Sequence, residues 1–537
     1  MKRIYYNGKV YTGELPFTEA FSVSDGRFLQ VGSNEEILSA KEECDELIDL
    51  EGAFVCAGFN DSHMHLLGFG QALSFAPLAE HTDSLAAVIE CLRTHLNTHE
   101  FGAGRWLCGR GWNQDFFTDT DRMPNRHDLD CVSKDIPIII TRTCGHCCVV
   151  NSKALELAGI NADTPSPEGG AIGMENGEPD GRLFDNAIDL LNACRPLPDK
   201  AEIKDMIRLA CKKLNSFGIT SSQTDDYCVF RGVPYEIVNE AYRELESSGE
   251  LTVRVYEQCN FTETSELVRF LDDGLVTGKG SDLFRIGPLK LLGDGALGSR
   301  TAYLSKPYLG TDNERGFPLF SREKMNELVS IANRNGMQVA VHAIGDACLD
   351  MVLDAIENAL EECPRKDHRH GVVHCQISRK DQLERIAKLD LHVYAQSIFL
   401  DYDNHIVEKL VDPETARTSY CWRTLMKKGV SVSNGSDCPV ELPDVMKGIQ
   451  CAVTRRSLDG AGPLNIGEAF TVKEAIDSFT KEGAVSSFEE NEKGFIRAGY
   501  LADFVIMESD PFESEAEELH EIKPKETYLS GRCVYKA

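Results

Sequence analysis

From about residue 200 onward, short apolar runs alternate with segments whose apolar residues recur at helical spacing. The apolar runs predict strands, and the amphipathic segments between them predict helices. The predicted strands cover 218–223, 251–256, 287–292, 338–342, 370–374, 392–396 and 430–437. The predicted helices cover 200–217, 234–249, 264–273, 321–335, 348–361, 378–389 and 414–428. An earlier apolar run at 53–58 reads as a short buried strand and brings the number of strands to eight.

Eight alternating strand and helix units predict an α/β fold of the TIM (β/α)8 barrel type. A doubly wound open sheet is the alternative topology for such alternation. That alternative is disfavoured because no Gly-x-Gly-x-x-Gly sequence follows an early strand. In a barrel of this type, the active site lies at the C-terminal ends of the strands.

The two ends of the chain have a different pattern, with short β segments separated by turn residues. Asn7-Gly8 and Asp25-Gly26 are hairpin signals, and strand-like runs return at 502–507 and 526–535. We therefore expect a β-sandwich domain built from 1–52 plus 485–537, around a barrel domain at 53–484. Residues of about 66–200 interrupt the alternation after the first barrel strand, and we expect this insertion to shape the active site.

Composition limits the partners of the chain. The sequence has 86 acidic and 56 basic residues, for a formal net charge of -30. This charge argues against nucleic acid or anionic membrane surfaces as general partners, but it says little about the substrate, since a local pocket can differ in sign. The expected partner is a small-molecule substrate. The 19 cysteines show no disulfide framework, the first residues show no secretory signal, and no apolar run is long enough for a membrane helix. We expect reduced thiols and a cytoplasmic location.

Polar residues stand at the ends of several predicted barrel strands. Two histidines two positions apart point the same way at a strand end, because side chains alternate along a strand. Two histidines alone would be weak evidence for a site. The strand ends together carry His63, His65, Lys290, His342, His374 and Asp437. Four histidines and an aspartate converging on one barrel mouth predict a site for zinc or a similar divalent ion.

Lys290 lies inside an apolar strand, between Leu289 and Leu291. An unpaired lysine is costly to bury. Its neutral amine can react with carbon dioxide to give a carbamate, whose two oxygens could bridge two metal ions. The alternative is an ordinary ion pair with Asp294 or Asp437.

The sequence resembles the amidohydrolase superfamily, in the branch of YtcJ-like and N-substituted formamide deformylase-like proteins (amidohydrolase family 3). The resemblance rests on motifs spread over nearly the whole chain: 58–65 (GFNDSHMH), 290–300 (KLLGDGALGSR), 341–346 (VHAIGD), 373–376 (VHCQ) and 435–440 (GSDCPV), with weaker matches at 111–114 and 150–155. It implies a metal-dependent hydrolase with a TIM barrel, a β-sandwich from both termini and a carbamylated Lys290. It also implies metal ligands at His63, His65, Lys290, His342, His374 and Asp437, with one or two zinc ions.

The expected reaction is hydrolysis of an amide or formamide C–N bond by metal-activated water, with Asp437 as general base and then acid. His146, on the insertion, is the candidate donor to the developing oxyanion. The candidate substrate contacts are Trp112, Phe116 and Arg300, although the aromatic residues could instead fill the core of the insertion. Deamination on the same metal site and a catalytically inactive relative are the competing functions. A homodimer paired through the terminal sandwich is the expected assembly.

The sequence departs from the family pattern near the expected pocket. Cys144 stands where an acidic residue often precedes Gly-His, Val373 where a glutamate often precedes the histidine, and Cys438 where a tryptophan often follows the aspartate. These differences make the substrate of any relative an uncertain guide to the substrate of this chain.

Overall fold

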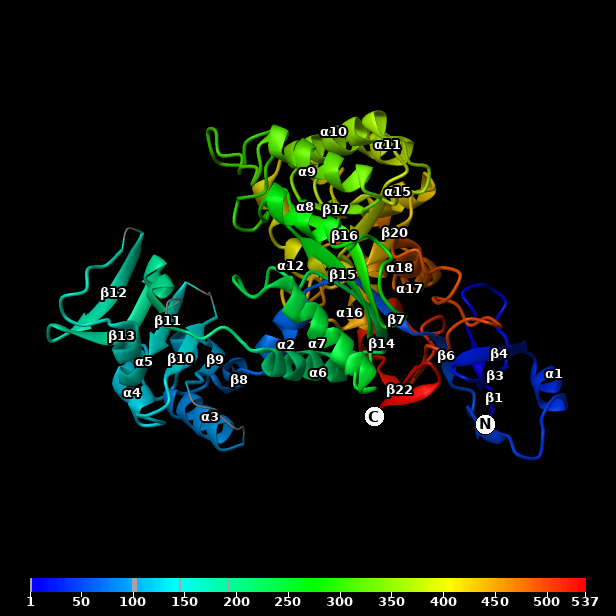
Figure 1. Cartoon of the computed structure of the whole chain (residues 1–537), viewed down its shortest axis with the longest axis horizontal. Helices are drawn as coiled ribbons and strands as arrows, with labels where there is room; N and C mark the ends of the chain where they lie inside the picture. Colours follow the sequence, from blue (N-terminus) through cyan, green and yellow to red (C-terminus); the bar gives the residue numbers. More distant parts are fainter. Residues whose placement is uncertain (1, 99–103, 144–145, 168, 192–193) are drawn as a thin grey trace. The chain divides into compact units, whose positions relative to one another are not determined.

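The structure is a computed structural model that describes residues 2–98, 104–143, 146–167, 169–191 and 194–537. The chain forms two compact units. One consists of the residues up to 69 together with 210–537, and the other of 70–209. Figure 1 shows the order of the elements along the chain by colour.

The first unit contains an eight-stranded parallel sheet whose neighbours follow chain order. Its strands are β7 (Phe59–Met64), β14 (Ile219–Thr224), β15 (Arg254–Asn260), β16 (Phe284–Leu292), β17 (Val339–Ala343), β18 (Gly371–His374), β19 (His392–Ala395) and β20 (Val432–Asn434). Just beyond the strand ends, Asp437 N donates to His63 O (2.8 Å) and His65 N to Cys438 O (2.7 Å). These bonds bring the last strand beside the first, and the predicted barrel fold is confirmed.

Helices follow the barrel strands as predicted, with one exception. They are α6 (Lys200–Ser216), α7 (Tyr235–Ser247), α8 (Thr264–Asp272), α9 (Arg322–Arg334), α10 (Asp346–Glu362) and α11 (Lys380–Lys388). The helix predicted at 414–428 is instead two short helices, α14 (Pro413–Ala416) and α15 (Trp422–Lys427). Between them Tyr420 has a positive φ of 57°, and its amide donates to Gln376 O (2.6 Å) outside any helix. Helices α16 (Val445–Thr454), α17 (Val472–Ser478) and α18 (Lys481–Ser486) follow β20.

Both chain ends contribute to two further sheets. One has the order β4-β3-β1-β5, and the other the order β2-β6-β21-β22-β23. Their strands are β1 (Arg3–Tyr6), β2 (Lys9–Val10), β3 (Ala20–Ser24), β4 (Arg27–Gly32), β5 (Glu46–Asp49), β6 (Phe54–Ala57), β21 (Phe504–Met507), β22 (Pro524–Leu529) and β23 (Arg532–Lys536). Their shared core includes Tyr5, Phe21 and Phe504.

The apolar run before His63 is therefore two strands rather than one. Residues Phe54–Ala57 pair with β21 in the terminal sheet, and the first barrel strand begins at Phe59. Gly58 separates the two, and a Cβ at this position would lie 2.2 Å from Thr220 Oγ1. Such a contact is too short for any other residue, so the glycine allows the close approach of β7 to β14. This boundary lies a few residues later than the one expected at residue 53.

The second unit has its own six-stranded sheet, in the order β12-β13-β11-β10-β9-β8. Its elements are β8 (Ala76–Pro77), α3 (Leu85–Thr98), β9 (Leu107–Trp112), α4 (Arg126–Asp130), β10 (Ile138–Arg142), β11 (Cys147–Val150), α5 (Ser152–Ala158), β12 (Gly170–Glu175) and β13 (Glu178–Asp185). Two clusters of buried apolar side chains, around Leu107 and around Leu183, give this unit a core of its own.

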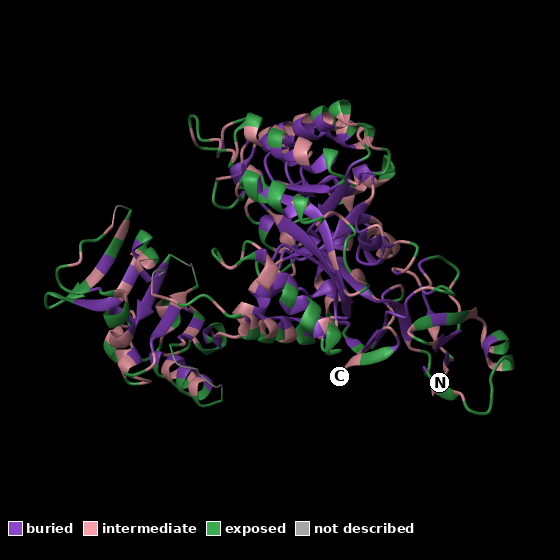
Figure 2. Cartoon of the chain, in the orientation of Figure 1, coloured by how far each residue is buried: buried purple, intermediate pink, exposed green. Residues whose placement is uncertain are grey.

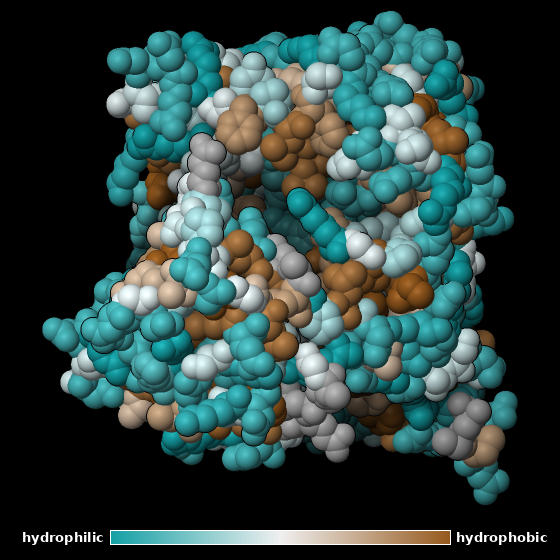
Figure 3. Space-filling model, turned by 60° about the vertical axis from the view of Figure 1, so that its left-hand side comes forward, coloured by the Kyte–Doolittle hydropathy of each residue, from teal (hydrophilic) through white to brown (hydrophobic). Residues whose placement is uncertain are grey.

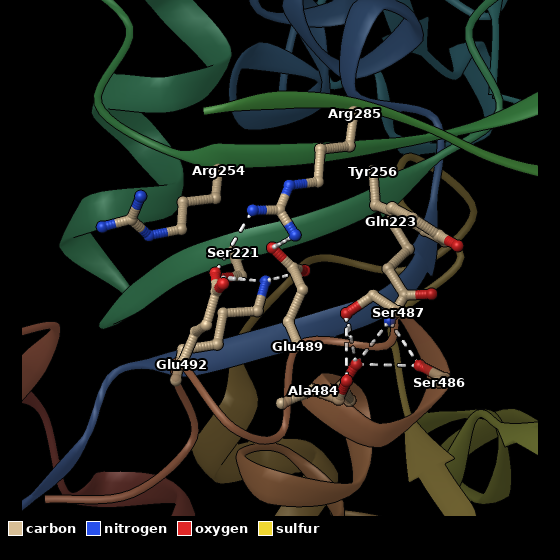
Figure 4. A network of polar contacts seen from close by, with 12 residues as sticks. Ser221, Gln223, Arg254, Tyr256, Arg285, Ala484, Ser486, Ser487, Glu489 and Glu492 are labelled. Carbon is tan, nitrogen blue, oxygen red and sulfur yellow. Dashed lines mark hydrogen bonds and ion pairs between the residues drawn. The ribbon is translucent and has the colours of Figure 1, made fainter. Parts of the chain in front are cut away.

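A polar network joins the N-terminal ends of the barrel strands to the segment after α18 (Figure 4). Glu489 pairs with Lys493 (2.6 Å) and with Arg285 at the start of β16 (3.4 Å). Lys493 also donates to Ser221 of β14 (3.2 Å), and Gln223 donates to Gly483 O (2.9 Å). These contacts hold α18 and the segment after it against β14 and β16 at this end of the barrel.

Burial follows the layers of the fold (Figure 2), with the barrel strands buried and the outer faces of the helices exposed. Hydrophilic residues dominate the face shown in Figure 3, with smaller apolar patches between them. No helix of the described residues is long and apolar enough to cross a membrane. Every cysteine that the structure describes is a free thiol.

His392, the first residue of β19, is expected to make the fold sensitive to acid. Burial, with a smaller contribution from Arg369, lowers the pKa of His392 to about 3. A depressed histidine pKa stabilises the fold above the unfolded pKa of about 6.5, and the stabilisation is lost as the pH falls from there toward 3. Between pH 7 and pH 5 this one group should account for a loss of about 2 kcal/mol. Denaturant unfolding of His392→Gln should show a pH dependence smaller by that amount, whereas identical pH dependence would contradict the assignment.

Candidate metal centre

Three of the predicted ligands meet where the first and last barrel strands adjoin. His63 lies near the C-terminal end of β7, His65 comes directly after β7, and Asp437 lies just beyond the end of β20. Asp437 Oδ1 lies 3.4 Å from His63 Nε2 and 3.2 Å from His65 Nε2. The two histidines therefore face the same carboxylate, as the alternation of side chains along a strand predicts.

Two glutamines fix the orientation of the buried histidine rings. Gln258 donates to Ser62 O (3.1 Å), so its side-chain oxygen faces His63 Nδ1 at 2.7 Å. Gln396 donates to Tyr394 O (3.0 Å), and its oxygen faces His374 Nδ1 at 2.7 Å. Each Nδ1 must carry the hydrogen, and each Nε2 is left with a lone pair.

The facing ring nitrogens of His342 and His374 both carry lone pairs, so neither can donate a hydrogen bond to the other. His342 Nε2 lies 3.2 Å from Gly295 O and donates to it, which leaves a lone pair on Nδ1. That Nδ1 lies 2.9 Å from His374 Nε2, which also has a lone pair. Two facing lone pairs repel each other unless a proton or a metal ion lies between them or beside them.

His65 differs, because its Nδ1 donates to Asp225 O at 3.0 Å and its Nε2 donates to Asp437 Oδ1 at 3.2 Å. The nitrogens of His63, His342 and His374 that face the centre of the site are acceptors, and so is the carboxylate of Asp437. His63, His374 and Asp437 offer ligand atoms within 4.8 Å of one another. This buried set of nitrogen and oxygen acceptors has the chemistry that a divalent cation completes.

The electrostatics agree with this donor set. Burial lowers the pKa of His63 well below the ordinary range, and the charge of Lys290 lowers it further. Burial also lowers the pKa of His374 well below the ordinary range, with a further contribution from His342. Burial alone would raise the pKa of Asp437, but the hydrogen bond from His65, whose own pKa is raised by that contact, holds the pKa of Asp437 well below its usual range. His63 and His374 are thus neutral and Asp437 is ionised, the forms that bind metal.

Lys290 is buried in β16, with about 1% of its surface exposed. Its Nζ lies 3.7 Å from Asp225 Oδ2, just beyond the end of β14. This is the only ion pair that the structure gives to Lys290 among the described residues. The alternative partners considered from the sequence were Asp294 and Asp437. Asp294 instead accepts from the backbone amides of 303, 344 and 345, at 2.8 to 3.0 Å, and holds the loop after β16 in place.

Two of the candidate ligands have a backbone φ angle that residues other than glycine rarely adopt. His374 has φ of 73° and Asp437 has φ of 57°. Positive φ is uncommon outside glycine and asparagine, and it concentrates at functional sites. His374 is the last residue of β18 and Asp437 follows β20, so both unusual conformations occur where a barrel strand ends.

The remaining candidates have different surroundings. Trp112 is fully buried in the core of the second unit, so it fills that core rather than a substrate pocket. Phe116 is 64% exposed on the same unit. The His146 ring is 79% exposed and pairs with Asp185 at 2.9 Å. Arg300, after β16, pairs with Glu314 at 3.3 Å and is 42% exposed. Roles for His146, Phe116 and Arg300 stay predictions, and Cys144 and Gly145 lie outside the described residues.

The sequence reasoning missed three residues that contact the candidate ligands, namely Gln258, Gln396 and Asp225. The available signal was a polar residue inside or at the end of an apolar strand, the same signal that singled out Lys290. Gln396 ends the predicted strand at 392–396, and Gln258 lies two residues beyond the one predicted at 251–256. Polar side chains at these positions can only be buried with a partner.

The sequence is similar to those of several known proteins. The amidohydrolase family model matches residues 46–535. The putative amidohydrolase YtcJ of Bacillus subtilis is 34% identical over the whole length of both chains. An N-substituted formamide deformylase of Arthrobacter pascens is 28% identical over 96% of this chain and 95% of the relative.

A solved structure agrees with these sequence matches. An uncharacterized metal-dependent hydrolase from Pyrococcus furiosus is 29% identical, with a TM-score of 0.79 over 96% of this chain and 100% of that one. The family match over most of the sequence, the relative at 34% identity and the shared fold agree with the barrel and the polar cluster at its mouth. The chain belongs to the amidohydrolase family and is a hydrolase of the metal-dependent amidohydrolase superfamily.

Proposed function

We propose that the chain hydrolyses a C–N bond, of the amide or formamide type, in a small molecule. The observation that carries the proposal is the set of lone pairs on His63, His342 and His374 that lie beside one another and beside the ionised carboxylate of Asp437. Similarity to an N-substituted formamide deformylase supports the choice of bond.

The residues that would hold the cation are His63, His65, Lys290, His342, His374 and Asp437, and zinc suits their nitrogen and oxygen atoms. A bound divalent cation would supply Lewis acidity, lowering the pKa of water and polarising a carbonyl. For a two-ion centre, the neutral amine of Lys290 attacks carbon dioxide, a new N–C bond forms and one proton leaves the nitrogen. The resulting carbamate would add two anionic oxygen atoms to the residues that hold the cation.

Asp437 is the chain's proton carrier in this scheme. Its Oδ1 accepts the proton from the attacking water, and the protonated carboxyl then delivers that proton to the leaving nitrogen. His63 and His65 orient the carboxylate through their contacts with Oδ1. We propose His146 as a donor to the developing oxyanion and Arg300 as a contact for the part of the substrate that does not react.

Deamination is the second candidate, and one observation favours it. Lys290 Nζ lies 3.7 Å from Asp225 Oδ2, and a lysine in an ordinary ion pair suits a centre with one ion and no carbamate. Turnover assays on formamides and amides, beside assays on aminopurines, would separate the two reactions. Hydrolysis of aminopurines alone would replace the proposed function with the second candidate.

Removing the metal should inactivate and destabilise the protein. A ligand that binds only the folded chain stabilises it by about 4 kcal/mol at a thousand times its Kd, so chelation should lower the thermal midpoint and zinc should restore it. Elemental analysis of protein purified with bicarbonate and without chelator gives the number of ions. About two zinc ions per chain would support the carbamate, and about one would favour deamination. No bound metal, together with no thermal shift on adding zinc, would contradict the proposal.

A further inference from the structure

Asp225 is a fully buried carboxylate that has almost nothing to neutralise it. Neither side-chain oxygen accepts a hydrogen bond from any described residue, and the one ion pair of this carboxylate within the described part of the chain is with Lys290 Nζ, at 3.7 Å. An ionised carboxylate buried this way is costly unless it is paired, hydrogen-bonded or bound to a metal.

The neighbouring residue, Asp226, shows how this fold provides hydrogen bonds to a buried carboxylate with a structural role. Asp226 is equally buried, but Leu67 N (2.8 Å), Thr224 Oγ1 (2.8 Å) and the Tyr242 hydroxyl all donate to it. Asp225 has none of these partners, although it stands on the same loop. The difference indicates that the orphaned oxygens of Asp225 face something absent from the chain itself.

A histidine nitrogen and a cysteine sulfur lie close to Asp225. His65 Nδ1 lies 3.0 Å from the backbone oxygen of Asp225, and Cys228 Sγ lies 3.5 Å from that same oxygen. A ligand atom from each of His65, Asp225 and Cys228 lies within 4.8 Å of the others. Cys228 is an exposed thiol, so this group can be reached from solvent.

We propose that His65, Asp225 and Cys228 form a second cation position beside the candidate metal centre. One nitrogen, one carboxylate oxygen and one sulfur are a donor set that suits zinc or cobalt and excludes magnesium and calcium, which prefer oxygen alone. On binding, the Cys228 thiol loses its proton to solvent and the sulfur bonds the ion as thiolate. A histidine has one nitrogen free for an ion here, so His65 gives up its hydrogen and bonds this ion, and the first centre keeps His63, His374 and Asp437. The inference rests on the proposed metal function, because both positions lie at the same barrel mouth.

Cobalt(II) tests this proposal with a readout that does not depend on turnover. A thiolate bound to cobalt gives a near-ultraviolet charge-transfer absorption that nitrogen and oxygen ligands do not give. The full-length protein, stripped of metal and titrated with cobalt(II), should show this absorption. Cys228→Ser should abolish it and lower the bound cobalt by about one ion per chain, and Asp225→Asn should lower the bound cobalt in the same way.

Matched controls separate a ligand role from a structural one. Cys533→Ser removes another exposed thiol, in the terminal sheet, and should leave the absorption unchanged. Asp226→Asn removes the hydrogen-bonded neighbour and should keep the full cobalt content. Cys228→Ser is expected to fold normally because the side chain is exposed, and circular dichroism would verify this.

The outcomes distinguish this inference from the proposed function. If the protein binds cobalt and hydrolyses its substrate but shows no thiolate absorption, the second position is wrong and the proposed function stands. If Cys228→Ser binds as much cobalt as the unchanged protein, the second position is likewise wrong. If the unchanged protein binds no cobalt at all, both the second position and the proposed metal function fail.

Discussion

Asp437→Asn should lower turnover by about a thousandfold while leaving the protein folded. General acid and base catalysis by a positioned side chain contributes on the order of 10² to 10⁴ in rate, and an amide side chain cannot accept the proton. Asparagine is a suitable replacement because the backbone here has φ of 57°, a conformation that asparagine tolerates better than most residues. The measurement is kcat on a substrate that the unchanged protein hydrolyses, together with the metal content of each protein.

The metal content decides how the result is interpreted. If the variant keeps its metal and loses turnover, the proton-carrying role is supported. If the variant keeps its metal and full turnover, the role assigned to Asp437 is wrong. Asp477→Asn is a matched control, because Asp477 is also buried but bonds to Tyr11 and two lysines away from the barrel mouth. It should leave kcat unchanged.

Removing Asp503 should destabilise the fold by about 3 to 5 kcal/mol, because a buried guanidinium would lose its partner. Arg254, the first residue of β15, makes two bonds to Asp503, at 2.6 and 3.0 Å, and both side chains are almost fully buried. Arg254 also donates to Asp282 O (3.0 Å) and Ser530 Oγ (2.7 Å), so its charge is held at the meeting of the barrel and the terminal sheet. The measurement is the free energy of unfolding of Asp503→Ala in denaturant.

A double variant tests the cause of that loss. Arg254→Met combined with Asp503→Leu removes both charges, and replacing a buried ion pair by apolar residues is often neutral or stabilising. The double variant should therefore regain most of the stability that Asp503→Ala loses. A loss below about 1 kcal/mol in the single variant would show that the pair is solvated like a surface pair.

Much of the fold follows from the sequence because the barrel is periodic. Each parallel strand is buried on both faces, so its apolar run is continuous and easy to locate. The break at Tyr420 and the division at Gly58 could not be predicted the same way. They depend on one backbone angle and one close contact between strands that are distant in sequence.

The candidate ligands were predictable because polar residues at the ends of buried strands stand out. Their surroundings were not. Gln258 orients His63 from a different strand, and Asp225 rather than Asp294 lies beside Lys290. Such pairings are set by which strands are neighbours in space. Trp112 was open to two interpretations, a pocket wall or the core of the insertion, and the structure places it among the buried side chains of the second unit.

The pairing of β6 with β21 has a consequence for the order in which a newly made chain can fold. Residues Phe54–Ala57 leave the ribosome early, but Phe504–Met507, beside which they lie, are made near the end of synthesis. The barrel likewise waits for Asp437 and Cys438, whose backbones bond to His63 and His65. The 70–209 unit, whose sheet pairs only strands from within it, can fold while synthesis continues. During that interval β6 and β7 have unpaired edges, which invite pairing with other chains. Production of this protein should therefore benefit from slow expression and from chaperones that cover unpaired strands.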